Sequence, residues 1–423
     1  MDLRRTEMGG EAPIHSWKDV MLNQTAIAAL KSELRGELIE PNDTRYDVMR
    51  KVYNAMIDRK PRLIARCADA ADVIAALKFA REHKLPLSIR GGGHNAVGLG
   101  ICDDGLVIDL SPIKYVRVEP KKRTVLAGGG ALWGDVDHAT HAFGLAVPAG
   151  IISTTGVGGL TLGGGIGHLT RQCGLTIDNL LAVDVVLADG SFVTASANEN
   201  ADLFWAVRGG GGNFGVVTSF LFKAHPIHTN YAGPMLWPME DAAEILRWYR
   251  GFITKAPSSL NGFFAFLTVP PGPPFPEHLH NKKMCGIVWC YTGPLKQAER
   301  VFKCMFDALW HSTMHLYPID GKARSIKNAA TPWSYRDAIW AGVIIGVDPS
   351  PDNKEKISSW ARDYWSALHP YSAGGAYINF MMDEGEDRVR ATYGKNFNRL
   401  AKIKKRYDPA NLFRVNQNIP PAP

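Results

Sequence analysis

The sequence predicts an α+β fold in two lobes, for three reasons. Its 423 residues exceed the length that one hydrophobic core usually supports. An apolar share of 46% and a charged share of 21% are ordinary for globular chains, which excludes a disordered or fibrous protein. Strand-like and helix-like runs alternate from residue 61 onward, and the 42 glycines are bunched, which marks places where backbone approaches another group closely.

The first lobe begins with a strand, a helix and a strand. Apolar runs predict strands at 62–66 and 86–90, and apolar residues at helical spacing predict a helix over 72–84. Asp189-Gly190 is typical of a tight hairpin turn, so the runs beside it form an antiparallel pair. Further strands are expected at 106–110, 124–127, 181–187, 192–195 and 216–222, with a helix at 133–143 followed by a glycine-rich loop.

A second lobe follows a change of composition near residue 226. Aromatic residues become dense between 227 and 372, where strand-like runs alternate with amphipathic ones such as 294–309. The proline-rich run 269–276 cannot donate ladder hydrogen bonds, so we expect an exposed connection or lid there. The tail is helical by pattern over 386–406, until Tyr407-Asp408-Pro409 stops it.

Charge, cysteine and hydropathy patterns exclude several classes of protein. The net charge of +7 suits an anionic ligand, but it lacks the clustered stripe of a nucleic-acid binder, and the basic run 402–406 is interpreted as a solvated helix face. Six cysteines without a CxxC pair indicate reduced, buried thiols. Neither a signal peptide nor a membrane span is visible, which predicts a cytoplasmic location and no membrane partner.

The first glycine cluster, at 90–95, directly follows an apolar strand. Consecutive glycines let backbone N–H groups converge on an anion, and a diphosphate is a common ligand of such a nest. Gly91, Gly93 and Ala96 have the dinucleotide spacing G-x-G-x-x-G/A, as do Gly210, Gly212 and Gly215. A Rossmann site needs a helix after the loop, whereas a loop and a strand follow here, so an NAD fold is disfavoured.

The second glycine cluster covers residues 156–167. So much glycine costs conformational entropy without adding core, so something must fill the space beside it. A large, flat, phosphate-bearing cofactor against bare backbone would do so, because a small substrate or a metal does not need two separated glycine walls. The alternative is a pair of long glycine turns.

These segments resemble the berberine-bridge-enzyme-like FAD-linked oxidases of the vanillyl-alcohol-oxidase flavoprotein superfamily, whose FAD-binding domain is of the PCMH type. The resemblance covers about 55–226 and 374–421, and the central lobe matches only in position. It rests on RGGGH at 90–94, TTGVGG at 154–159, GGGIG at 163–167, GLTIDN at 174–179, FWAVRGGGGNFGVVT at 204–218 and YDPANLF at 407–413.

The resemblance implies both the domain organisation and the cofactor. It implies an FAD-binding domain over 1–226 in two α/β subdomains split near 112–125, a substrate-binding domain over 227–372 with an antiparallel sheet covered by helices, and a segment 373–423 that returns to the FAD domain. The cofactor-binding residues that it implies are Arg90, Gly91, Gly92, Gly93, His94, Asn95, Gly98, Ala149, Gly150, Thr154, Thr155, Gly158, Gly159, Gly163, Gly165, Gly167, His168, Gly215, Val217 and Asn416.

His94 is implied to bond covalently to the 8α-methyl of FAD. A neutral imidazole is a competent nucleophile near neutral pH, although a lone histidine in a glycine loop is otherwise usually a plain hydrogen-bonding residue. Relatives with a second tether carry a cysteine where this chain has Ile152, so a single covalent bond is expected. Leu160 replaces a histidine of some relatives near the flavin N1 edge, and His168 is a weak substitute; Cys173 is interpreted as structural.

The resemblance also implies the reaction, which is hydride removal from a substrate C–H to flavin N5. Thr155 matches the oxygen gate, and its valine-like shape favours an oxidase that forms hydrogen peroxide from O₂. Tyr377 matches a tyrosine that lines the active site and would need a lowered pKa to act as a base; an ordinary strand aromatic is the alternative. Asn379 is implied to contact flavin or substrate.

The richness in aromatics favours a small aromatic or heterocyclic alcohol or amine as substrate. A flavin dehydrogenase with another acceptor and a non-redox binding protein are the alternatives, and both monomer and homodimer stay open. No metal is expected: His311 and His315 have the i, i+4 spacing of zinc ligands on a helix but lack a third ligand, so solvent-facing histidines are favoured.

Overall fold

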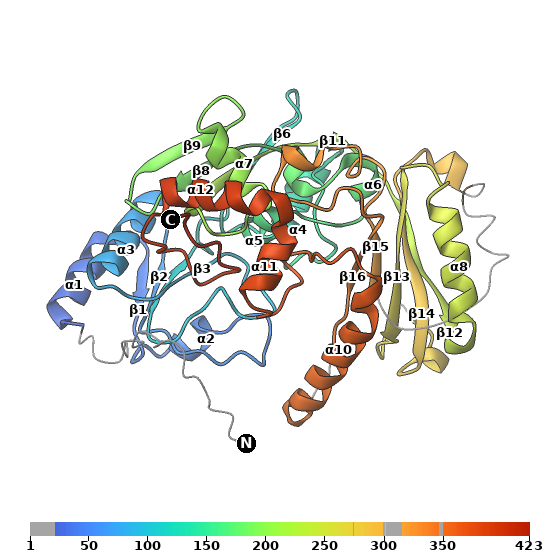
Figure 1. Ribbon diagram of the computed structural model, residues 1–423, viewed down its shortest axis with the longest axis horizontal. Coiled ribbons are helices and arrows are strands. Elements are labelled where there is room, and N and C mark those ends of the chain that lie inside the picture. Colours follow the sequence, from blue (N-terminus) through green and yellow to red (C-terminus); the bar gives the residue numbers. More distant parts are fainter. Residues whose placement is uncertain (1–21, 274, 299–300, 302–314, 347–349) are drawn as a thin grey trace, which may run out of the picture.

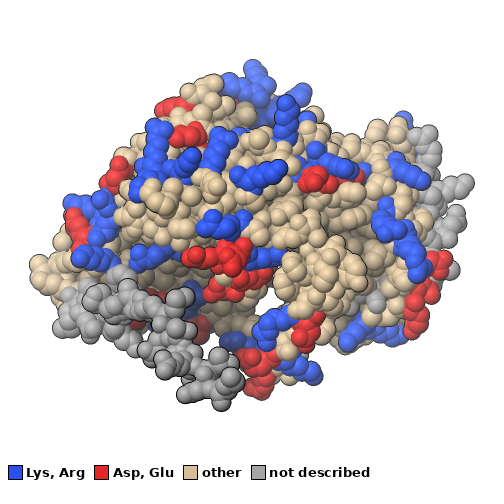
Figure 2. Space-filling view, in the orientation of Figure 1, with Lys and Arg blue, Asp and Glu red and all other residues tan. Residues whose placement is uncertain are grey.

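A computed structural model describes residues 22–273, 275–298, 301, 315–346 and 350–423. The protein has three main sheets, which follow one another along the long axis of the molecule (Figure 1). None of the helices in these ranges is long and apolar enough to cross a bilayer. On the face shown in Figure 2, Lys and Arg side chains are dispersed among Asp and Glu rather than gathered in one stripe.

The first sheet has the order β1-β2-β4-β3, with β1 antiparallel and the other neighbours parallel. Apolar faces of two helices, α1 and α3, pack on it, and Asp69 caps α3 through its side chain. The elements are α1 (Gln24–Glu33), β1 (Glu37–Ile39), α2 (Tyr46–Met49), β2 (Leu63–Arg66), α3 (Ala70–Glu82), β3 (Leu87–Arg90) and β4 (Leu106–Asp109). The predicted strand–helix–strand start is confirmed.

The second sheet is antiparallel, in the order β5-β6-β10-β8-β9, and carries a core of apolar side chains from its strands and from the helices α4, α5, α7, α11 and α12. The hairpin predicted around Asp189-Gly190 is confirmed as β8–β9. The strands are β5 (Val116–Glu119), β6 (Thr124–Gly128), β8 (Leu180–Val186), β9 (Phe192–Ser196) and β10 (Val216–Lys223), and β7 (Leu145–Ala146) pairs with β11 (His225–Pro226). The helices are α4 (Trp133–His141), α5 (Val157–Gly163), α6 (Thr170–Cys173), α7 (Ala201–Val207), α11 (Glu386–Tyr393) and α12 (Phe397–Tyr407), with a 3-10 turn η2 (Thr176–Asn179).

The third sheet is antiparallel, in the order β12-β14-β13-β15-β16. Alternate residues face opposite sides: Phe264 packs under α8, whereas Phe263 faces the first lobe. α10 extends away from the body of the protein (Figure 1). The elements are β12 (Tyr231–Pro238), α8 (Ala242–Ile253), β13 (Leu260–Thr268), β14 (Lys283–Tyr291), β15 (His315–Pro318), β16 (Trp340–Val343) and α10 (Lys354–Leu368).

Several predictions about local structure were wrong. The second glycine cluster is not all loop, because Val157 and Thr161 are buried and anchor the short helix α5, which ends at Gly164 with a φ of 134°. The C-terminal helix is two helices, since Gly394 has a φ of 47° between α11 and α12. His315 is half-buried and starts strand β15, so it is neither helical nor solvent-facing, and His311 lies outside the described residues.

The basic run 402–406 is only partly a solvated face. Lys404 is fully buried: its ammonium donates to Asp408 and to the carbonyls of Asn213 and Phe413. The five cysteines in the described residues are free and buried, as predicted, and Cys304 lies outside them. Of the amphipathic run 294–309, only residues 294–298 and 301 are described, and Leu295–Gln297 forms a 3-10 turn.

Candidate functional site

The two glycine clusters meet directly. A Cβ on Gly92 would lie 2.4 Å from the backbone nitrogen of Gly156, and a Cβ on Gly156 would lie 2.4 Å from that of Gly92. A third segment joins them, because a Cβ on Gly91 or on Gly158 would lie 3.2 Å from the carbonyl oxygen of Gly129. Only glycine allows this approach. The ends of β3 and β6 and the start of α5 therefore form one wall of bare backbone.

Strand β10 supports this wall from behind. The Val217 carbonyl would lie 2.4 Å from a Cβ on Gly129, so β10 packs directly against the third segment of the wall. Gly215 precedes it with a φ of 149°, and a Cβ there would lie 2.5 Å from the Val185 side chain. Both residues thus shape the wall.

His94 lies at the end of the first cluster, after Gly93 with its φ of 68°. Its ring stacks on Tyr53, with ring centroids 3.9 Å apart and an interplanar angle of 19°, and its Nε2 lies 2.9 Å from Thr154 Oγ1. Partial burial lowers the pKa of His94 below its ordinary value. The imidazole is therefore neutral at pH 7, and two partners hold its ring in place.

A cavity of about 410 Å³ opens in front of this loop. Residues of the first glycine cluster line it, together with residues 48–53, the end of β4, and Leu132 and Thr154. Its lining comprises Val48, Met49, Lys51, Val52, Tyr53, Arg90, Gly91, Gly92, Gly93, His94, Asp109, Ser111, Leu132 and Thr154. The consecutive glycines 91–93 in its lining suit an anionic group such as a diphosphate, because backbone N–H groups can converge on an anion there.

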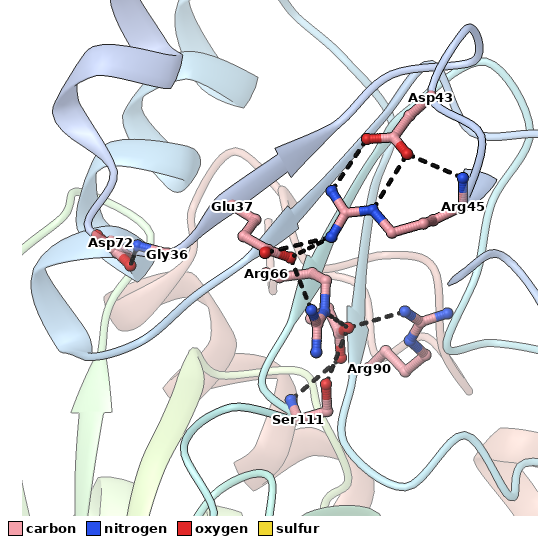
Figure 3. Close-up of polar contacts among 9 residues, drawn as sticks. Gly36, Glu37, Asp43, Arg45, Arg66, Asp72, Arg90 and Ser111 are labelled. Carbon is pink, nitrogen blue, oxygen red and sulfur yellow. Dashed lines mark hydrogen bonds and ion pairs between the residues drawn. The ribbon is translucent and has the colours of Figure 1, made fainter. Parts of the chain in front are cut away.

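Arg90 shapes this cavity through buried contacts (Figure 3). Its Nη2 donates to Asp109 Oδ2 at 2.9 Å, and its Nη1 donates to the Met49 carbonyl at 2.5 Å. Asp109 also accepts hydrogen bonds from the backbone N–H and hydroxyl of Ser111. The guanidinium is thus bound to protein groups, so Arg90 ties the end of β3 to the ends of β4 and α2, directly before the first glycines.

Asn95 and Gly98 give the rest of the loop its shape. The Asn95 Oδ1 accepts the N–H groups of Val97 and Leu99, both at 3.1 Å. Gly98 has a φ of 75°, and a Cβ there would lie 2.6 Å from the Ile57 side chain. No helix starts here, which explains why the G-x-G-x-x-G spacing does not make a Rossmann site.

At the far end of α5 the protein itself fills the space beside the glycines. A Cβ on Gly163 would lie 2.0 Å from Asn379 Oδ1, one on Gly165 would lie 2.0 Å from the Thr176 hydroxyl, and one on Gly167 would lie 1.8 Å from the Ala149 carbonyl. Gly159 differs, because a Cβ there meets no atom within 4 Å. The open side of α5 is thus at Gly159, one turn before Gly163.

Tyr377 and Asn379 bind the backbone of this helix and the turn after it. The Tyr377 hydroxyl accepts the Gly165 N–H at 3.0 Å and the Asn379 Nδ2 at 2.7 Å, and Asn379 also donates to the Leu160 carbonyl at 3.1 Å. Burial raises the pKa of Tyr377 to about 12. Its phenol therefore keeps its proton at pH 7.

Aromatic rings of the third sheet face this region, and most of them were not predicted from the sequence. Tyr317 on β15 stacks on Phe263 of β13, with ring centroids 5.0 Å apart. The Phe380 ring centroid lies 6.0 Å from that of Tyr317 and 4.6 Å from that of Tyr377. Trp333 packs on Tyr377 at 5.0 Å. The alternation of side chains along β13 and β15 was the available signal for this aromatic face.

The remaining predicted residues lie around the same wall. Asn416 donates to the carbonyls of Gly212 and Phe413, and its Oδ1 is buried without a hydrogen-bond partner. The His168 ring lies 5.5 Å from Phe263, and its Nδ1 is likewise buried without a partner. The Thr155 carbonyl accepts the Trp133 N–H at 2.9 Å, which fixes the segment before α5. Gly150 lies on that segment, where a Cβ would meet Leu160.

This arrangement fits FAD. The bare wall leaves room for a flat ring system at Gly159, the cavity at Gly91–Gly93 suits a diphosphate, and Asn416 has an unused buried acceptor near the glycines 209–212. In the described ranges, no group of three or more His, Cys, Asp or Glu side chains could hold a metal ion.

Comparisons with known proteins agree with this geometry. The family model "FAD binding domain" matches residues 61–196, and the model "Berberine and berberine like" matches residues 376–420. Both glycine clusters and His94 lie in the first match, and Tyr377, Asn379 and Asn416 lie in the second.

Relatives match over nearly the whole chain. An uncharacterized FAD-linked oxidoreductase of Bacillus subtilis is 31% identical over 92% of this chain and 98% of its own length. The (R)-6-hydroxynicotine oxidase of Paenarthrobacter nicotinovorans is 39% identical over 92% of this chain and 97% of its own length.

Solved structures share the fold. The 6-hydroxy-D-nicotine oxidase of Arthrobacter nicotinovorans aligns with a TM-score of 0.74 at 25% identity, over 92% of this chain and 98% of that one. The BBE-like 1 protein of Physcomitrella patens aligns with a TM-score of 0.82 at 21% identity, over 95% and 100%. The predicted fold class is therefore confirmed. The chain is an oxidoreductase enzyme with an FAD-binding domain, and it belongs to the berberine-bridge-enzyme-like family of FAD-linked oxidoreductases.

Proposed function

We propose that this enzyme is an FAD-dependent oxidase of small aromatic or heterocyclic alcohols or amines, and that it produces hydrogen peroxide. One observation carries the proposal: α5 begins at the glycine wall and ends beside the aromatic face, because a Cβ on Gly164 would lie 2.7 Å from Trp333 and 3.3 Å from Tyr377. Bound along the wall, FAD would supply the acceptor for a hydride from a substrate carbon.

His94 is proposed as the single covalent anchor of FAD. Its lowered pKa supports this role because the neutral imidazole keeps a lone pair for bond formation. Tyr53 and Thr154 both contact the His94 ring, so the orientation of the imidazole is fixed before FAD binds. Ile152 stands where a second anchor would need a cysteine, and it has no nucleophilic atom.

The domain organisation is proposed as an FAD-binding unit over 1–226, a substrate unit over 227–372 and a closing segment over 373–423. The closing segment supports this division because α11 and α12 pack into the core of the second sheet, together with strands of the first unit. Substrate would then approach the flavin from the aromatic face on β13 and β15.

The aromatic face supports the proposed substrate class. Phe263, Tyr317 and Phe380 offer stacking surfaces within one apolar cluster, which suits the flat ring of an aromatic substrate. The relative named (R)-6-hydroxynicotine oxidase agrees with a heterocyclic amine. We propose that Tyr377 and Asn379 orient the bound substrate, with Tyr377 as a neutral hydroxyl rather than as the base.

Thr155 is proposed to admit O₂ to the reduced flavin because its side chain is small and branched. The test is anaerobic mixing of the yellow protein with benzyl alcohols, N-methylbenzylamine and (R)-6-hydroxynicotine, followed by readmission of air. We expect bleaching by at least one compound, then rapid return of colour with stoichiometric peroxide. Reoxidation no faster than that of free flavin would indicate a dehydrogenase, and no bleaching by any compound would contradict the substrate class.

A further inference from the structure

His315 and Tyr317 form a hydrogen-bonded pair on β15. The two residues are separated by one position in the strand, so both side chains lie on the same side of the sheet, toward the first lobe. The Nδ1 of His315 lies 3.2 Å from the Tyr317 hydroxyl oxygen. Tyr317 is 7% exposed and His315 is half-buried, so water competes little for this bond.

The protonation states of the pair follow from its surroundings. Burial lowers the pKa of His315, so the imidazole is neutral at pH 7, and burial together with the nearby Tyr377 hydroxyl raises the pKa of Tyr317. A neutral phenol has a proton to donate, and an imidazole nitrogen is a good acceptor for it. The hydroxyl oxygen of Tyr317 then keeps a lone pair for another donor.

Two further titratable groups face the pair from neighbouring elements. The Phe380 ring contacts both Tyr377 and Tyr317, and the Phe263 ring contacts His168 as well as His315 and Tyr317. Tyr377 is poorly placed to accept another proton because its hydroxyl already accepts hydrogen bonds from Gly165 and Asn379. Among the residues that the structure describes, the hydrogen-bond partner of the Tyr317 hydroxyl is His315, so Tyr317 is the better acceptor on the aromatic face.

We propose that Tyr317 accepts the substrate O–H or N–H proton and that His315 is its positioning residue, which takes up the Tyr317 proton in the same step. This inference rests on the proposed function, which supplies the hydride acceptor. The substrate O–H or N–H proton moves to the Tyr317 oxygen while the Tyr317 proton moves to His315 Nδ1. The substrate C–H leaves as hydride to the oxidised cofactor, so the substrate loses two electrons and gains a C=O or C=N bond.

The hydrogen bond is tested without any substrate. In holoenzyme labelled with ¹⁵N-histidine at pH 7.5, His315 is expected to be neutral with its proton on Nε2, and Tyr317→Phe is expected to shift its Nδ1 resonance. The matched control is Tyr231→Phe on β12, the strand at the opposite edge of the same sheet. This variant is expected to leave the resonance in place. A charged His315, or an Nδ1 resonance that ignores Tyr317→Phe, overturns the proposal.

Kinetics test the proton transfer itself. With the compound that bleaches the wild-type flavin fastest, Tyr317→Phe is expected to slow anaerobic bleaching by about 100-fold or more, as loss of a general base does. Tyr231→Phe leaves the rate unchanged. An undiminished rate in Tyr317→Phe overturns the proposal, as does a larger loss in Tyr377→Phe than in Tyr317→Phe. If the wild type bleaches with no compound, the proposed function fails, whereas the resonance measurement still decides the pair.

The pH profile separates positioning from structure. Bleaching by the wild type should fall as pH decreases below 6.5, because protonated His315 cannot accept the Tyr317 proton. His315→Gln can still hydrogen-bond but cannot titrate, so its rate should be lower at pH 7.5 and should lose this acid limb. An acid limb that survives unchanged in His315→Gln contradicts the positioning role.

Discussion

At the scale of single residues, a comparison of two exposed glycines separates a proposed ligand site from an ordinary solvent-exposed position. A Cβ added to Gly159 in α5 or to Gly251 in α8 would meet no atom within 4 Å, and both are exposed helix residues. Gly251 lies on the outer helix of the third sheet, whereas Gly159 lies on the glycine wall. Only the space at Gly159 is proposed to hold FAD.

We predict that Gly251→Ala stabilises the protein by about 0.5–1 kcal/mol without changing its flavin content, since alanine is the better helix former. Gly159→Ala should stabilise the apo-protein in the same direction but lower the flavin retained per chain, because the new methyl group occupies the place of the ring system. Thermal unfolding and the ratio of visible to protein absorbance measure both effects. Full flavin content in Gly159→Ala would show that the ring system of FAD does not lie against Gly159.

Buried imidazoles make the stability depend on pH. Burial lowers the pKa values of His94, His168, His225 and His315 from 6.5. Below pH 6.5 the unfolded chain binds protons that the folded protein does not yet bind, so the free energy of unfolding decreases as pH falls from 6.5 toward the lowered values. Above pH 6.5 this contribution is constant.

His225→Gln isolates one such contribution outside the site. His225 Nε2 lies 2.6 Å from Asn179 Oδ1, and glutamine can donate to the same oxygen without titrating. We predict that urea unfolding shows a smaller loss of stability between pH 7.5 and 5.5 in this variant than in the wild type. An equal or larger loss would mean that His225 is protonated in the folded protein.

At the scale of elements, α12 is fixed to the glycine loop 209–215 by one buried cation. Lys404 and Asp408 are fully buried and 2.6 Å apart, and Lys404 also donates to the Asn213 carbonyl. Asn213 in turn donates to the Gly210 carbonyl and accepts the Ile419 N–H. The ion pair therefore links three chain segments beside the proposed FAD site.

Lys404→Met is predicted to destabilise the protein by about 3–5 kcal/mol, because it leaves the Asp408 charge buried without its partner. Lys402→Met on the exposed side of the same helix is the control, with a change within about 0.5 kcal/mol. Equilibrium unfolding in urea compares the two variants. Similar, small effects of both would mean that the loss of its partner at Asp408 costs little.

The sequence predicted most of these elements and misjudged specific ones for physical reasons. Strands such as β2, β3 and β10 were predictable because they are short runs dominated by apolar residues. α5 was not, since glycine is a poor helix former and only tertiary burial of Val157 and Thr161 offsets that cost. The burial of Lys404 was also missed, although Asp408 four residues later was a visible signal for a partner.

The site was predictable only where motifs carry it. His94 and both glycine clusters follow from local sequence, and the structure brings them together at Gly92 and Gly156. Tyr317 could not be found in this way, because strand pairing and the returning segment 377–380 bring it near Tyr377 from a distant part of the chain. The order of the strands in the third sheet and the path of the returning segment determine the contacts of Tyr317, and neither can be read from local sequence.

At the scale of the whole molecule, two buried arginines join the lobes. Arg171 on α6 donates to Asp320 and to carbonyls of Ile253, Pro257 and Leu260 in the second lobe. Arg336 of the second lobe pairs with Asp178 at 2.7 Å. These contacts hold the second lobe against α6 and the 3-10 turn η2 of the first lobe.

Arg171→Met is predicted to cost about 3–5 kcal/mol, because Asp320 loses its buried partner and several carbonyls lose their donors. The control is Lys78→Met, which breaks the exposed pair with Glu82 and should cost less than about 0.5 kcal/mol. Thermal unfolding with tryptophan fluorescence compares them. A loss no larger than that of the control would show that the lobes do not depend on this clamp.

The central claim is that the glycine wall holds one FAD, tethered through His94 alone. The most direct measurement is the intact mass of the denatured polypeptide, prepared with ample riboflavin, for the wild type and for His94→Ala. We expect the mass of the chain plus one FAD for the wild type, and the mass of the bare chain for His94→Ala, which still binds flavin before denaturation. A wild-type mass equal to that of the bare chain, or an FAD adduct that persists in His94→Ala, would contradict the claim.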